Sequence, residues 1–352
     1  MLDKKTTIRW LSVMVVASVL LIGVAGTHAE VTIETVLVGD VGNAADDTSY
    51  GSVSYEYRIG KYEVTNAQYA EFLNAVASTD TNGLWNSNMA AWSGGIEQNG
   101  GWGNYTYAVK SIPDEDEDQI PNSHPDRISG TGNGYANLPV NNVQWGDTLR
   151  FANWMHNGQP TGAQDASTTE DGAYDMFLGN GAVRKAGAKY FVPSEDEWYK
   201  AAFYKGGGTD AGYYEYATSS DAVPVEEKPP GGANSAMYSR IIWPWDPNIA
   251  SVGSYTGSPS PYGTFDQNGS MWEWLEESDA ETVDPLKKVL RSGDWWTEAI
   301  YLSASHQELA SPAWNTSIVG FRLAEPQTEE VLLPGDANRD GVVSADDYGS
   351  VQ

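Results

Sequence analysis

The 352-residue chain contains no cysteine. It can therefore form no disulfide, hold no metal through thiolate sulfur and use no cysteine nucleophile. Histidine is scarce as well, with 4 residues in the chain and no His-Glu-x-x-His or His-x-x-x-His spacing. These absences argue against a disulfide-stabilised scaffold and against a histidine-bound zinc or iron centre.

Basic residues are also few. The sequence has 20 Lys+Arg against 48 Asp+Glu, a formal net charge of −28. Binding to nucleic acid depends on basic side chains that neutralise phosphates, so we expect no nucleic-acid partner. Such an acidic surface suits solubility and the binding of divalent cations.

Long hydrophobic runs are absent except at the N-terminus. Residues 10–26 form one apolar run of 17 residues, preceded by Lys4, Lys5 and Arg9 and followed by Thr-His-Ala at 27–29. This arrangement predicts a signal peptide over residues 1–29 and a secreted, periplasmic or cell-surface location. The alternative is an uncleaved membrane anchor, since the run lies at the lower edge of a span. A membrane partner is expected only in that case.

Glycine, proline and aromatic residues are abundant, with 37 Gly, 17 Pro, 14 Trp and 20 Tyr. This composition predicts a loop-rich fold with a large aromatic core, and not a helical bundle. Alternating or apolar segments predict strands at residues 31–38, 55–64, 289–296 and 319–323. Residues 79–138 read as surface loops, and residues 205–265 as loops with short strands.

Three helices are predicted. Thr65 and Gln68 form a capping box at the start of a helix of about 12 residues. A second helix covers about residues 146–156, with His156 at its end and not at a metal site. A second capping box at residues 194–197 precedes a third helix. Its helical residues are Trp198, Ala201, Ala202 and Tyr204.

A calcium-loop pattern occurs at the C-terminal end of the chain. Its spacing places oxygen ligands at regular positions, with Gly341 at the sharp turn. The predicted ligands are Asp336, Asn338, Asp340, Val342 through its carbonyl, Ser344 and Asp347. The last position holds Asp instead of the longer Glu. The alternative is an acidic, disordered tail.

This loop, with its terminal Asp, resembles one repeat of a type I dockerin. A dockerin carries two such repeats, and this sequence contains one, at residues 336–352. The resemblance implies calcium as the bound ion and a cohesin-like partner for the tail.

Six further segments occur in the order found in one enzyme family. They are residues 59–69, 138–145, 192–198, 262–274, 291–295 and 319–322. Among them are Leu-Pro-Val-Asn-Asn-Val-Gln-Trp, Arg-Ser-Gly-Asp-Trp and Val-Gly-Phe-Arg. In these segments the chain resembles the formylglycine-generating enzyme and sulfatase-modifying-factor family. The resemblance implies an α+β, C-type-lectin-like fold with few helices, small twisted sheets and many loops. It places this domain at residues 31–324, followed by a linker at 325–335.

The resemblance also bears on catalysis. Enzymes of this family oxidise a sulfatase cysteine to formylglycine with a copper ion held by two cysteines. In this sequence the matching positions are Thr297 and Leu302, neither of which binds Cu(I) through sulfur. We therefore expect no formylglycine-generating activity.

The family further implies structural calcium at a Gly-Asn-x-Trp-Glu-Trp segment. Here Ser270 replaces the Asn, and Glu273 keeps its carboxylate between two tryptophans. Glu273 is thus a candidate calcium ligand, and Asn234 matches a ligand of a second site. The alternative for Glu273 is an ion pair with a buried arginine, Arg291 or Arg322.

Three functions remain open. The first is a non-catalytic module that binds a glycan or an extracellular protein through aromatic loop residues, against the alternative that these residues are core. Its candidate contacts are Trp92, Trp102, Trp243, Trp245, Trp295 and Trp296. The second is a cysteine-independent oxidoreductase or other enzyme with Asp294, Trp295 and Thr297 in the former active-site groove. The third is a structural or assembly protein docked through its tail.

Overall fold

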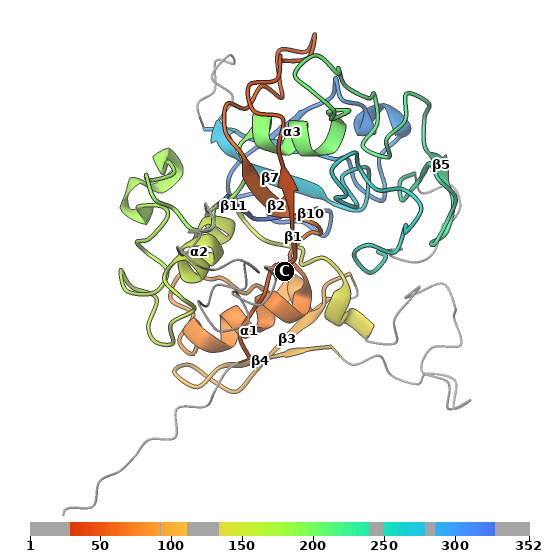
Figure 1. The fold of residues 1–352 in the computed structure, drawn as a ribbon. Coiled ribbons are helices and arrows are strands. Elements are labelled where there is room, and N and C mark those ends of the chain that lie inside the picture. Colours follow the sequence, from red (N-terminus) through yellow and green to blue (C-terminus); the bar gives the residue numbers. More distant parts are fainter. Residues whose placement is uncertain (1–28, 92, 111–133, 240–248, 279–285, 328–352) are drawn as a thin grey trace, which may run out of the picture.

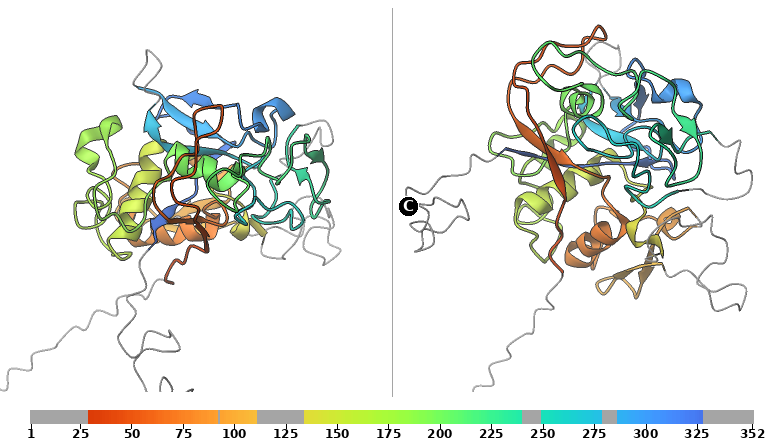
Figure 2. Two further views of the ribbon diagram at one scale, coloured as in Figure 1. Left: turned by 45° about the horizontal axis from the view of Figure 1, so that its top comes forward. Right: turned by 45° about the vertical axis from the view of Figure 1, so that its right-hand side comes forward.

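The structure is a computed structural model that describes residues 29–91, 93–110, 134–239, 249–278 and 286–327. The predicted signal peptide (apart from its last residue), most of the linker and the predicted calcium loop lie outside these residues. The described chain is α+β, with short helices, small sheets and long loops (Figures 1 and 2), as the sequence predicts. Within the described residues, no helix combines the length and the apolar character needed to cross a membrane.

One sheet joins the two ends of the domain. It has the order β1-β2-β11, formed by β1 (Thr35–Val38), β2 (Tyr57–Gly60) and β11 (Ala324–Pro326), and both pairings are antiparallel. β11 extends two residues past the predicted end of the domain at residue 324. Glu325 belongs to β11, where it accepts a hydrogen bond of 2.8 Å from Thr35 Oγ1 and lies 3.5 Å from Arg58 Nε.

A second sheet has the order β10-β7-β8-β9. Its strands are β7 (Trp272–Ser278), β8 (Lys288–Arg291), β9 (Glu308–Ala310) and β10 (Val319–Gly320). β10 pairs with β7 in parallel, and the other pairings are antiparallel. The predicted strands at 289–296 and 319–323 are shorter in the structure, as β8 and β10 show. Beyond β8 the backbone turns away at Ser292 and Gly293, with φ of 99° and 74°.

The three predicted helices are present: α1 (Asn66–Val76), α2 (Trp145–His156) and α3 (Glu195–Phe203). Both predicted capping boxes form, at Thr65 with Gln68 and at Ser194 with Glu197. Tyr204 was expected within the third helix but is its C-cap, with extended backbone. α3 packs against β7, and α1 packs against α2 (Figure 1).

Residues 79–138 are not loops throughout. They include an antiparallel hairpin of β3 (Ile96–Asn99) and β4 (Thr106–Val109). Asn74 of α1 holds this hairpin because its side-chain amide exchanges two hydrogen bonds of 2.8 Å with the backbone of Tyr107. A second short pair joins β5 (Val225–Glu226) and β6 (Ser235–Ala236). Short 3₁₀ helices lie at Ser87–Ala90, Gly134–Asn137, Met176–Gly181 and Ala299–Leu302.

Aromatic rings fill the core between α1, α2 and the closing segment at Phe321. Phe72 and Phe151 meet edge to face with ring centroids 5.3 Å apart, and Phe151 meets Phe321 in the same way at 5.5 Å. Such edge-to-face contacts are favourable beyond the area that they bury. The aromatic side chains therefore pack mainly in the core. This packing positions the loops at the rim of the second sheet.

Candidate functional site

A groove of about 480 Å³ lies where the chain leaves β8. Its aromatic lining consists of Trp272, Trp295, Trp296, Tyr301 and Trp314. Its polar lining consists of Asp294, Thr297, Glu308 and Ser317. The described residues that line it include two carboxylates and no lysine, arginine or histidine. The sequence singled out Asp294, Trp295, Trp296 and Thr297, and the structure places all four here.

Asp294 and Thr297 fix the turn that forms one wall of the groove. Asp294 Oδ1 accepts a hydrogen bond of 2.6 Å from the Trp296 amide, and the Asp294 amide donates to Thr297 Oγ1 at 2.9 Å. An aspartate bonded to its own backbone two residues ahead stabilises such a turn. Trp295 is thereby buried, while Trp296 stays 45% exposed, with its ring 5.3 Å from that of Trp295.

The two positions that match the copper-binding cysteines flank one glycine. A β-carbon placed on Gly293 would lie 2.7 Å from Leu302 Cδ2 and 3.1 Å from Thr297 Oγ1. Leu302 Cδ2 and Thr297 Oγ1 are therefore no further apart than the sum of these two distances. Neither can serve Cu(I), because one offers a hydroxyl and the other an isobutyl group. These residues do not fit the copper ion of the family.

Asp294 is a buried acid beside the groove. It is 0% exposed, and its Oδ2 has no hydrogen-bond partner of full geometry among the described residues. Burial raises the pKa of Asp294 to about 6, although the backbone amides of Trp296 and Thr297 and the Trp272 side chain act in the opposite direction. The carboxyl is thus ionised at neutral pH in a site that stabilises its charge poorly.

The opposite face of β7 carries Glu273, because neighbouring residues of a strand point to opposite sides. Both of its oxygens bind Arg322, at 2.6 Å from Nε and 2.7 Å from Nη2, and Trp198 Nε1 donates to it at 2.9 Å. The structure therefore shows the alternative left open by the sequence, with Arg322 as the partner. Arg291, the other candidate, pairs with Glu195 instead.

Asn234 is also engaged by the protein. Its Oδ1 accepts a hydrogen bond of 2.6 Å from Thr218, and its Nδ2 donates to the carbonyls of Ala222 and Val223. These contacts close a surface loop. The roles predicted for Asn234 and Glu273 as calcium ligands thus compete with bonds that they already make, and those roles stay predictions.

Two further acids, Glu63 and Asp266, lie next to Glu273, and Asp266 Oδ2 accepts a hydrogen bond of 2.5 Å from the Gly253 amide. Glu63 is 2% exposed, and neither of its carboxylate oxygens has a hydrogen-bond partner of full geometry among the described residues. Burial raises the pKa of Glu63 well above its ordinary value, and the charges of Asp266 and Glu273 raise it further, while Arg322 and the Ser270 hydroxyl lower it. Burial likewise raises the pKa of Asp266 to about 6.

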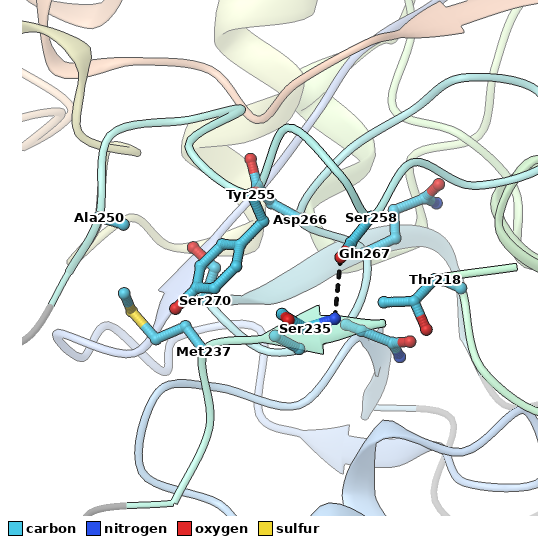
Figure 3. A pocket seen from close by; sticks show the side chains of 12 residues that line it. Thr218, Ser235, Met237, Ala250, Tyr255, Ser258, Asp266, Gln267 and Ser270 are labelled. Atoms are coloured by element: carbon cyan, nitrogen blue, oxygen red, sulfur yellow. Dashed lines mark hydrogen bonds between the residues drawn. The ribbon is translucent and has the colours of Figure 1, made fainter. Parts of the chain in front are cut away.

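These acids lie close to a very small cavity. Asp266 and Ser270 line a space of about 10 Å³ beside Tyr255 and Met237 (Figure 3). That volume is roughly what one water molecule needs. Within the part of the chain that the structure describes, no group of three or more His, Cys, Asp or Glu side chains is positioned to hold a metal ion. A cation here would therefore depend on two carboxylates supplemented by hydroxyl and carbonyl oxygens.

Several other predicted site residues belong to segments that the structure does not describe. The calcium-loop ligands Asp336, Asn338, Asp340, Val342, Ser344 and Asp347 lie outside the described residues, as do Trp92, Trp243 and Trp245. Trp102 is 68% exposed between β3 and β4 and does not line the groove.

Sequence reasoning missed several functional candidates. Trp272, Tyr301, Glu308 and Trp314 come from four separate segments, and only the fold brings them together. Glu63 did carry a detectable signal, since it is an acid within an otherwise strand-like segment.

A family model identifies the type of domain. Residues 30–327 match the family described as Sulfatase-modifying factor enzyme 1-like domain. Among solved structures, the chain is similar to Treponema denticola variable protein 1, with 19% identity, coverage of 85% of this chain and 97% of that chain, and a TM-score of 0.49. It is also similar to CarF, with 20% identity, coverage of 84% and 99%, and a TM-score of 0.45. For PvdO from Pseudomonas aeruginosa the values are 14%, 84% and 91%, and 0.42. No curated protein matches the chain.

Proposed function

The chain belongs to the Sulfatase-modifying factor enzyme 1-like family, and we propose that it acts there as a ligand-binding module without formylglycine-generating chemistry. One observation carries this proposal. Thr297 and Leu302 stand where the resemblance places the two cysteines, and the chain has no cysteine to replace them. The chain therefore lacks the copper site that the family's reaction uses, while the groove beside that position is open and lined by aromatic rings.

The groove has the features of a binding site. Its volume lies within the range of roughly 300–1,000 Å³ that small-molecule sites occupy. Exposed Trp296 and partly exposed Trp314 offer ring faces, and the side chain of Glu308 is 43% exposed. Aromatic faces with a few polar groups at one rim suit ligands that combine apolar and polar surface.

The test uses the purified chain that starts at residue 30. When this chain is incubated with a sulfatase peptide that contains the substrate cysteine, we expect no aldehyde to form on the peptide. We expect binding to some member of a glycan and peptide array, lost in Trp296→Ala and retained in Trp102→Ala. Trp102 is the matched control because it is exposed but lies outside the groove. Aldehyde formation, or binding that Trp102→Ala removes and Trp296→Ala does not, would overturn the proposal.

Calcium fits this domain best at Glu63 and Asp266. Calcium takes six to eight oxygens, and Glu63 offers two that the described residues leave without partners. Asp266 and the Ser270 hydroxyl lie next to it. When bound, the ion would neutralise two buried acids. Among the described residues, the opposite charge that acts on both is that of Arg322, which Glu273 already holds. Glu273 then positions Arg322 instead of binding the ion.

The N- and C-terminal segments complete the proposal. We infer that residues 1–29 direct export and that the loop at 336–347 binds calcium and docks the chain to a cohesin-like partner. The motifs themselves support this inference, as described from the sequence. Mass spectrometry of exported material tests the first part, with Glu30 as the expected N-terminal residue.

A cysteine-independent enzyme is the second candidate. It is favoured by Asp294, a buried carboxyl with a pKa raised to about 6 beside the groove, as acid–base catalysts often have. If Asp294 is catalytic, Asp294→Asn abolishes turnover of a bound ligand without weakening its binding. If Asp294→Asn loses binding, and the unsubstituted chain binds the ligand without turnover, the result favours the binding module.

A further inference from the structure

We propose that the ligand of the groove is a small organic cation, an ammonium group that carries alkyl substituents. This inference rests on the proposed function and specifies its ligand. It draws on the charge of the lining and on its aromatic rings.

The charge of the groove is one-sided. Asp294 stands behind the aromatic wall and Glu308 at the rim, and no basic side chain is among the described lining residues. The nearest imidazole, His306, has its Nε2 4.0 Å from Glu308 Oε2. Burial lowers the pKa of His306, so that side chain is neutral at pH 7 and does not cancel the acid. The groove therefore keeps a net negative charge.

Asp294 acts on the groove through space. Its Oδ2 is buried, so a ligand cannot reach that atom without a shift of the wall. Charges separated by low-dielectric protein interact more strongly than charges in water. A cation in the groove would stabilise the ionised form of Asp294, which burial disfavours. A neutral ligand would provide no such compensation.

The rings supply complementary surfaces. Trp295 and Trp296 are nearly perpendicular, with an interplanar angle of 77°, and Trp272 and Tyr301 meet at 82°. Trp272 and Trp295 are buried, so the ring surfaces that a ligand can contact are mainly those of Trp296, Tyr301 and Trp314. The negative faces of aromatic rings attract ammonium groups, and indole does so best. Alkyl substituents on the ammonium also gain apolar contact with these rings.

A neutral glycan is the main competing ligand. Tryptophan faces also stack on sugars, but a sugar needs several hydrogen-bond donors and acceptors to be held in one orientation. The indole and hydroxyl groups of the lining can donate, among them Trp295 Nε1, a buried donor that lacks a partner among the described residues, but both charged groups of the lining are carboxylates. A neutral sugar would leave this negative charge uncompensated, so the charge favours the cation.

The test compares choline with 3,3-dimethylbutan-1-ol, which has the same shape without the charge. By calorimetry on the purified chain starting at residue 30, we expect choline to bind roughly tenfold or more tighter than the alcohol. Trp296→Ala and Glu308→Gln should each weaken choline binding, whereas Trp102→Ala should not. A thermal melt of each variant verifies that it is folded.

The outcomes separate this inference from the proposed function. If the alcohol or a neutral glycan binds as tightly as choline and Trp296→Ala removes that binding, the groove is a binding site and the cation assignment is wrong. If millimolar choline gives no saturable signal, the assignment is also wrong. If a lysine-containing peptide binds the groove far more tightly than choline, the small-molecule assignment gives way to a protein ligand.

Discussion

Arg322 binds both carboxylate oxygens of Glu273, and the pair is wholly buried, with both side chains 0% exposed. The same guanidinium donates to the carbonyls of Gly60 and Phe265, each at 2.9 Å. One ion pair thereby connects the second sheet to the end of β2 and to the loop beside Asp266. Glu273, which the family resemblance links to calcium, thus belongs to a structural centre of the fold.

Loss of one partner of this pair should be costly. Arg322→Met leaves Glu273 ionised in the interior without a counter-charge, and we expect the free energy of unfolding to fall by about 3–5 kcal/mol. Arg58→Met is the matched control, because Arg58 and Glu325 are partly exposed and 3.5 Å apart. Its cost should be about 1 kcal/mol or less. Urea titrations of both variants measure the difference, and equal losses would contradict the assigned role.

Calcium should change the pH dependence of stability through Glu63 and Asp266. A carboxyl with a raised pKa in the folded state binds its proton more tightly there than in the unfolded chain. Without calcium, stability should therefore fall as the pH rises from about 4 through about 6, the pKa of folded Asp266, and stay low above it. Calcium should offset this loss, so that its effect on the melting temperature is larger at about pH 7.5 than at about pH 5.

Glu63→Gln provides the control for this calcium effect. The substitution removes one buried charge, so in EDTA it should raise the melting temperature at about pH 7.5 and reduce the gain on adding calcium. Asp294 and Asp147 also have raised pKa values and remain in the variant, so the general fall of stability with pH should persist. An unchanged calcium response in Glu63→Gln would place the ion elsewhere.

Local and non-local features differed in how well the sequence predicted them. The capping boxes at Thr65 and Ser194 involve residues three apart, and both were confirmed. β7 was not predicted as a strand, although Trp272, Glu273 and Trp274 alternate in hydrophobicity as strand residues do. Its parallel pairing with β10 joins Trp272 to Val319, which are far apart in the sequence.

The candidate site shows the same division. Asp294 to Thr297 form one turn and could be found together as a short sequence block. Trp314 and Glu308 reach the groove only because β9 and the segment before β10 return to the second sheet. Hydrophobic periodicity in the sequence gives no information on such distant contacts, so the aromatic lining could be identified only from the folded structure.

Restoring sulfur should restore copper binding. In Thr297→Cys with Leu302→Cys, the two sulfurs would be γ atoms of the two side chains that approach Gly293, one of them in place of Thr297 Oγ1. We expect the double variant to bind one Cu(I) per chain in a competition titration with a chromophoric chelator, because thiolates select this ion. The single variants serve as controls and should bind far more weakly. If the double variant binds no better than they do, the groove has diverged from the geometry of the ancestral ion site.

The C-terminal loop should contribute one calcium ion of its own. Deleting residues 334–352 removes all six predicted ligands, Asp336 to Asp347, without touching the described domain. Calorimetric titration of the chain that starts at residue 30, with and without this segment, should show a loss of one site while the domain site remains. If the stoichiometry is unchanged, the loop assignment is wrong. Asp347→Ala in the full chain tests the unusual last ligand alone.

Asp294 should strengthen ligand binding while it lowers the stability of the folded chain. Its ionised form is disfavoured by burial, with a pKa of about 6 against an ordinary 3.8, so its cost is present above about pH 6 and absent below about pH 4. Asp294→Asn keeps an oxygen to accept from the Trp296 amide and should stabilise the chain by on the order of 1–3 kcal/mol at about pH 7.5. Near pH 4 the gain should vanish.

The same substitution should weaken the binding of choline, because the negative charge behind Trp295 is lost. Glu308→Gln is the matched comparison: its carboxylate is 43% exposed, so it should weaken binding without changing stability. Opposite changes in stability and affinity in Asp294→Asn are what a destabilising residue retained for function produces. If Asp294→Asn stabilises the chain and binds choline as tightly as before, the buried charge has no part in recognition, and Glu308 with the exposed rings must account for it.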